Sequence, residues 1–133
     1  MPNSAPILKD DPTPEDVRRA HENWLRDPWV LAGDDARARL RTLLEPHVDK
    51  HGAVSFEFYQ EPEWSTFALL DEVAVPVLIV VGEADIADVH AHSGAIEAAL
   101  RDVRRIVVPD AGHLVYFEQP AAFNRLVVDF LAR

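Results

Sequence analysis

The stretch "VPVLIVVGEAD", residues 75–85, decides the fold class. Its centre, residues 77–81, is a continuous apolar and mostly β-branched run with no polar alternation. Such a run is typical of a strand buried on both faces, as in a parallel sheet that helices cover. Gly82 ends the run, and an acidic residue, Asp85, follows three positions later. The sequence therefore predicts a buried strand that carries a carboxylate at its carboxyl end.

A second buried strand is predicted from "RRIVVP", residues 104–109. A helix is expected between the strands, over residues 93–102, and an amphipathic helix over residues 119–133, with Pro120 near its start. The order strand–helix–strand–helix implies parallel strands and a right-handed crossover. We therefore predict an α/β class and a parallel βαβα unit over residues 73–133, with open sheet edges because two strands are too few.

The preceding part of the chain, residues 13–72, is predicted to be helical. Thr13 and Asp16 have the spacing of a capping box, and Pro14 suits the first helical position. A second short helix is expected over residues 33–46, and a third over roughly 66–72. Residues 1–12 are polar, contain several prolines, and are expected to be a loose N-terminal segment.

Composition excludes several classes of function. The net charge of −10 makes nucleic acid and anionic membranes poor partners, and the absence of cysteine removes disulfides and thiolate chemistry. No apolar run approaches the roughly 18 residues of a membrane span, and the N-terminus lacks a signal-peptide pattern. A soluble, cytoplasmic protein without a cofactor is the expectation.

A histidine follows the second strand as Asp85 follows the first. It is His113, in "IVVPDAGHLVYFEQP", residues 106–120, where Gly112 is expected to permit a tight turn. Ligands of open α/β sheets gather beyond the carboxyl ends of the strands, so the carboxylate and the imidazole are expected to meet there. A carboxylate bonded to one ring nitrogen fixes the tautomer and leaves the other nitrogen as a base. Asp88 is the rival carboxylate.

These motifs resemble the C-terminal part of an α/β-hydrolase over about 60 residues. The family's acid loop often reads Gly-x-x-Asp, here residues 82–85, and its histidine loop reads Gly-His, then Glu-x-Pro, here residues 112–113 and 118–120, followed by a helix with Phe123. The resemblance implies a partial α/β-hydrolase fold in which residues 13–72 correspond to the helical cap. It also implies that Asp85 is the catalytic acid and His113 the catalytic base.

The family's nucleophile lies in an earlier G-x-S-x-G elbow, and no two glycines of this sequence are four positions apart. The expectation is thus the C-terminal portion of a serine hydrolase for an ester, lactone or similar bond. A nucleophile-bearing half, from a longer gene or from a partner chain, would complete it, and the chain alone would be inactive. The residues expected to contact a small ester-like substrate are Trp24, Trp64 and Leu114.

Alternatives remain beside these roles. Trp24, Trp29 and Trp64 equally suit the packing of the helical segment. The acidic and histidine residues of "EADIADVHAH", residues 83–92, suggest a metal site only weakly, so no metal is predicted. The chain is alternatively a non-catalytic, hydrolase-derived binding module that associates through its open sheet edge, or a truncated gene product.

Overall fold

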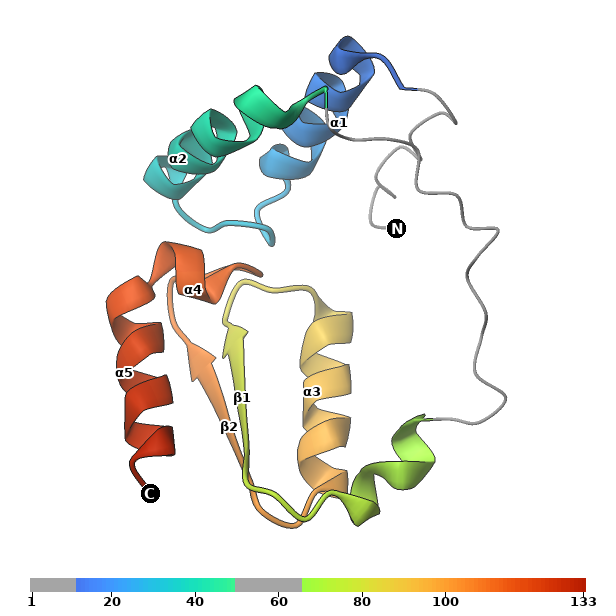
Figure 1. The fold of residues 1–133 in the computed structure, drawn as a ribbon, viewed down its shortest axis with the longest axis vertical. Helices are drawn as coiled ribbons and strands as arrows, with labels where there is room; N and C mark the ends of the chain where they lie inside the picture. The colour runs from blue at the N-terminus through green and yellow to red at the C-terminus, as the bar shows by residue number, and fades with distance from the viewer. Residues whose placement is uncertain (1–11, 50–65) are drawn as a thin grey trace.

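The computed structural model describes residues 12–49 and 66–133. In chain order, the elements within these ranges are α1 (Pro14–Arg26), α2 (Asp34–Leu44), η1 (Glu45–His47), η3 (Thr66–Glu72), β1 (Val77–Gly82), α3 (Ala87–Ala99), β2 (Val103–Val108), α4 (Val115–Glu118) and α5 (Pro120–Leu131). The α1–α2 hairpin lies above the carboxyl ends of the two strands, and the βαβα unit forms the lower part of the molecule (Figure 1). Within these ranges, no helix is both long and apolar enough to cross a bilayer.

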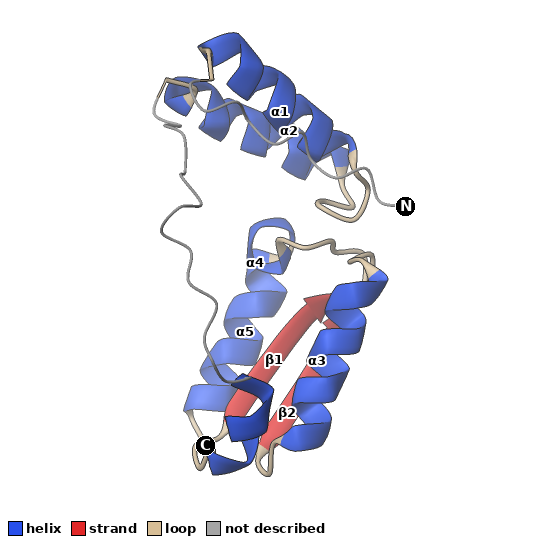
Figure 2. Ribbon diagram, turned by 90° about the vertical axis from the view of Figure 1, so that its right-hand side faces the viewer, coloured by secondary structure: helices blue, strands red, loops and turns tan. Residues whose placement is uncertain are grey.

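The two strands pair in parallel, as predicted, with Val77 opposite Val103 and Gly82 opposite Val108. Figures 1 and 2 show the sheet between α3 on one face and α5 on the other. Phe123 and Leu126 of α5 pack on the core cluster of Val108, Ala111 and Val115. This arrangement confirms the predicted α/β class and the parallel βαβα unit.

The strands are less buried than the sequence predicts. In β1 only Val81 and Gly82 are buried, and in β2 only Val108, while Val107 is 41% exposed. The reason is the width of the sheet: within the described residues each strand has one neighbour only, so one edge of each stays open.

The boundaries of α3 also differ from the prediction. The helix begins at Ala87, six residues before the predicted start, and it ends at Ala99. Its N-cap residue is Ile86, which makes no side-chain capping bond, so the sequence carries no start signal there. His90 and His92 consequently lie on a helix and not in a loop.

The helical segment folds as predicted at its start. Thr13 and Asp16 form the capping box of α1, with Pro14 in the first turn. Apolar residues of α1, α2 and the intervening turn build a core cluster from Leu25, Val30, Leu31 and Ala36. Leu114 and Phe117, which lie beyond β2, pack against this cluster and join the helical segment to the sheet unit.

Candidate active site

The acid loop is fixed by backbone bonds to the second strand and its loop. The Glu83 N–H donates to the carbonyl of Val108 and the Ala84 N–H to that of Ala111, each at 2.9 Å. A Cβ on Gly82 would lie 2.0 Å from the carbonyl oxygen of Gly112, so only glycine fits at this crossing of the two loops. The Gly-x-x-Asp spacing therefore brings the acid loop into contact with the histidine loop.

The histidine loop turns at Asp110, whose φ of 54° lies in the left-handed region. Gly112 has no positive φ, so the predicted reason for that glycine, a tight turn, is wrong. Its Cβ would lie 2.6 Å from the carbonyl oxygen of Trp29. Gly112 is required because the backbone of the helical segment approaches it closely.

The two loops bring Asp85 and His113 together. Oδ2 of Asp85 lies 2.9 Å from Nδ1 of His113, and Oδ1 accepts the Ile86 N–H at 2.8 Å. The Asp85 side chain is 3% exposed, whereas that of His113 is 43% exposed. A buried carboxylate, held through both oxygens, thus orients an imidazole that solvent can reach.

This geometry suits a base. An ionised carboxylate only accepts hydrogen bonds, so the bond places a proton on Nδ1 and leaves Nε2 free to take a proton from a reactant. The pair lies beyond the carboxyl ends of two parallel strands, where open α/β sheets bind their ligands. Among the described residues, the carboxylate bonded to the imidazole is that of Asp85, and the rival, Asp88, lies exposed in the first turn of α3.

A family model described as "Alpha/beta hydrolase family" matches residues 2–126. The chain belongs to this family. Solved structures agree with the predicted partial α/β-hydrolase fold: naproxen esterase from Bacillus subtilis has a TM-score of 0.68 at 22% identity, covering 86% of this chain and 42% of that one. MenH from S. aureus has a TM-score of 0.64 at 16% identity, covering 87% of this chain and 45% of that one.

A curated relative is similar in sequence. The Bacillus subtilis (strain 168) protein assigned as a 2-succinyl-6-hydroxy-2,4-cyclohexadiene-1-carboxylate synthase is 37% identical over 67 residues, which are 50% of this chain and 24% of that protein. The chain thus spans 42% of the length of the naproxen esterase, and the region matched in the Bacillus subtilis relative is 24% of that protein.

The turn between α1 and α2 borders the imidazole of His113. The His113 N–H donates to the carbonyl of Trp29 at 2.8 Å, and the two rings meet edge to face with centroids 5.6 Å apart. Glu118 binds both sides of this junction, accepting the Gly33 N–H at 2.9 Å and the Gly112 N–H at 2.6 Å. No local sequence pattern predicts these links, although Glu118 belongs to the quoted Glu-x-Pro motif.

The residues predicted to contact substrate have different positions. Trp24 and Leu114 are half-buried and pack against the core cluster of the helical segment. Trp24 lies in α1, and Leu114 directly precedes α4. Within the described ranges, the tryptophan whose ring meets His113 is Trp29. Trp64 lies outside the described residues, as do the other aromatic residues of 56–59.

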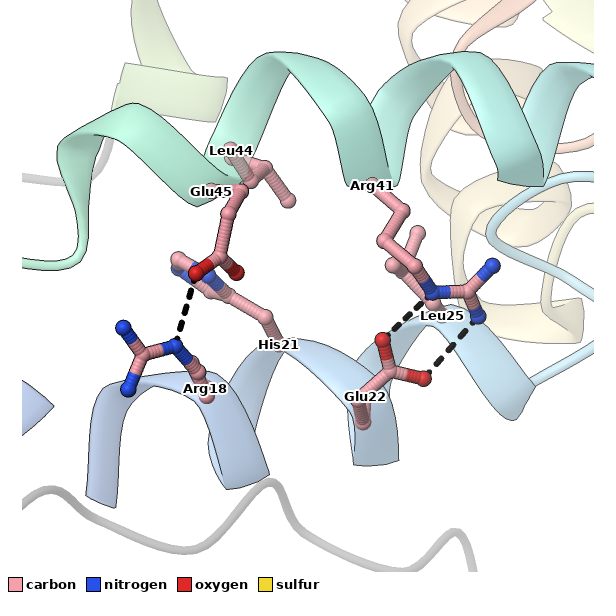
Figure 3. Close-up of a pocket in the computed structure, with 7 residues that line it drawn as sticks. All are labelled: Arg18, His21, Glu22, Leu25, Arg41, Leu44 and Glu45. Carbon is pink, nitrogen blue, oxygen red and sulfur yellow. Dashed lines mark hydrogen bonds and ion pairs between the residues drawn. The ribbon is translucent and has the colours of Figure 1, made fainter. Parts of the chain in front are cut away.

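A separate hollow of about 90 Å³ lies between α1 and α2. Figure 3 shows two ion pairs across it, Arg18 with Glu45 and Arg41 with Glu22, with His21 beside them. The hydrogen bond from Arg41 lowers the pKa of the Glu22 carboxyl below its ordinary value. Over residues 12–49 and 66–133, no three histidine or acidic side chains are grouped as a metal site requires.

Proposed function

We propose that this chain supplies the acid and the base of a hydrolase for esters, lactones or similar acyl compounds. The observation that carries the proposal is the 2.9 Å contact between the buried Asp85 carboxylate and Nδ1 of the exposed His113. The names of two similar proteins, naproxen esterase and "Est816 as an N-Acyl homoserine lactone degrading enzyme", support this substrate class.

In the proposed reaction, a serine from a G-x-S-x-G elbow outside these 133 residues attacks the carbonyl carbon. Nε2 of His113 takes the hydroxyl proton as the new C–O bond forms, and Asp85 stabilises the imidazolium. The same proton passes to the leaving alkoxide as the ester bond breaks. Water then hydrolyses the acyl-enzyme by the same route, which regenerates the serine.

We further propose that a nucleophile-bearing segment pairs with β1 and not with β2. Val77 and Glu83 donate their N–H groups to the carbonyls of Asp102 and Val108, on the β2 side. The backbone N–H and C=O groups of successive residues point to opposite sides of a parallel strand, so those of Leu78 and Val80 point to the open side of β1. Residues 77–82 carry no charge, whereas β2 contains Arg104 and Arg105, as edge strands often do.

The test begins with the source DNA around the codon for Met1. A coding stretch with the elbow motif is expressed with this chain, and hydrolysis of p-nitrophenyl butyrate is measured for each polypeptide and for the pair. We expect turnover from the pair only. We also expect His113→Ala to reduce it by about 10⁴-fold or more, because the base acts on every proton transfer. Undiminished turnover by that variant would disprove the role of His113.

The pairing is tested by Leu78→Pro, which removes an N–H on the open side of β1. Val107→Pro is the matched control. Val107 lies opposite Val81 in the register, and its own N–H points away from β1, to the outer side of β2. We expect Leu78→Pro to weaken binding of the elbow-bearing polypeptide by about tenfold, the value of one hydrogen bond. Equal binding by both variants would place the partner elsewhere. Concentration-dependent dimers of the chain alone would favour the alternative, a binding module that self-associates.

A further inference from the structure

The histidine loop is bound to the α1–α2 turn by more than the contacts of its histidine. Both oxygens of Glu118 are used: Oε1 accepts the Gly33 N–H at 2.9 Å, and Oε2 accepts the Gly112 N–H at 2.6 Å. Gly33 is the N-cap of α2, and Gly112 directly precedes His113. One carboxylate therefore joins the end of the turn to the residue beside the imidazole.

The bond to Gly112 is well placed to fix the ring. Gly112 is buried, and the carbonyl of Trp29 lies so close that a Cβ there would be 2.6 Å away. The ring of His113 is hydrogen-bonded to Asp85 through Nδ1, and the backbone N–H of His113 donates to the carbonyl of Trp29. A shift of the Gly112 backbone would change both contacts of His113 at once.

Charge also favours a carboxylate at this position. Two N–H donors converge on Glu118, and hydrogen bonds to a charged acceptor are about twice as strong as neutral ones. A glutamine has the same shape but a single acceptor oxygen, and its amide would face the second N–H donor to donor. The chemistry of the site therefore selects glutamate over its closest isostere.

We propose that Glu118 is a positioning residue, which holds His113 in contact with Asp85 and against the Trp29 ring by binding Gly112 and Gly33 simultaneously. The inference rests on the proposed role of His113 as the base. It adds that the helical segment, through Gly33, takes part in setting the orientation of that base.

Two spectroscopic signals of the chain report the two contacts without any need for turnover. The Nδ1 proton shared with Asp85 gives a far-downfield proton NMR resonance when that bond is formed. Protonated imidazole quenches an adjacent indole, so the emission of Trp29 depends on pH while the rings touch. The chain has three tryptophans, so Trp24→Phe and Trp64→Phe make Trp29 the sole emitter.

Glu118→Gln is expected to abolish the downfield resonance and most of the pH-dependent quenching, while circular dichroism stays that of the parent. Arg39→Gln is the matched control, because Arg39 also bridges the helical segment to α4, donating to the Phe117 carbonyl at 3.1 Å, but does not touch the histidine loop. It should keep both signals. Retention of both signals by Glu118→Gln would overturn the proposal, as would equal losses in the two variants.

A second variant decides the outcome if Glu118→Gln does not fold. Gly33→Pro removes one donor to Glu118 and leaves the other; the ψ of 139° at Gly33 suits proline, and its φ must move from −102° to about −65°. It should reduce the Trp29 quenching and keep the downfield resonance. Unchanged quenching would refute the link through Gly33. Absence of the downfield resonance in the parent chain would instead contradict the proposed function, in which Asp85 orients His113 as the base.

Discussion

The strand-end pair of Asp85 with His113 and the α1–α2 ion pairs both place carboxylates beside nitrogen-bearing side chains, but their construction differs. At the carboxyl ends of the strands, Asp85 is 3% exposed in its side chain and sits in a loop fixed by backbone bonds. Between α1 and α2, Glu22 and Glu45 are 38% and 56% exposed and are paired with long, flexible arginine side chains (Figure 3). Burial and a rigid backbone suit the first cluster to chemistry, while the second suits the adhesion of two helices.

The largest expected effect follows from replacing the buried carboxylate. Asp85→Asn keeps the shape of the side chain but no longer enforces a proton on Nδ1, so Nε2 is not kept free as the base. In an enzyme completed by a nucleophile, we expect kcat to fall by about 10⁴-fold. Asp88→Asn is the control and should retain full turnover. Normal kcat in Asp85→Asn would remove the functional distinction between the two clusters.

The rigidity of the strand-end cluster is tested by Gly82→Ala. The new Cβ would lie 2.0 Å from the Gly112 carbonyl oxygen and 2.4 Å from that of Ala111, and backbone atoms cannot yield easily. We expect the free energy of unfolding to fall by about 3 kcal/mol or more, measured by urea denaturation. Gly94→Ala is the matched control in α3, where the Cβ meets nothing within 4 Å. It should stabilise the chain by about 0.5–1 kcal/mol.

The same contrast explains what could be predicted from sequence. Both strands, the acid loop and the histidine loop were predictable, because a buried apolar run followed by Gly-x-x-Asp or Gly-His is a local pattern. The start of α3 was not, since Ile86 provides no capping side chain. The bond from Gly33 to Glu118 joins residues 85 positions apart, and no local pattern encodes such a contact. The proximity of Trp29 to His113 likewise depends on the packing of the helical segment against the sheet unit.

The smallest effect is expected in the α1–α2 cluster. The Arg41 guanidinium lowers the pKa of Glu22, so its ion pair stabilises the fold above the ordinary pKa of a glutamate and the stabilisation is lost as the pH falls through the lowered value. Glu22→Gln should therefore lower the melting temperature only slightly at pH 7, and not at all once the carboxyl is protonated or the salt concentration is high. A large decrease of the melting temperature in Glu22→Gln that persists in high salt would show that this cluster resembles the strand-end one. Its carboxylates would then owe their contribution to a fixed geometry and not to solvent-screened charge.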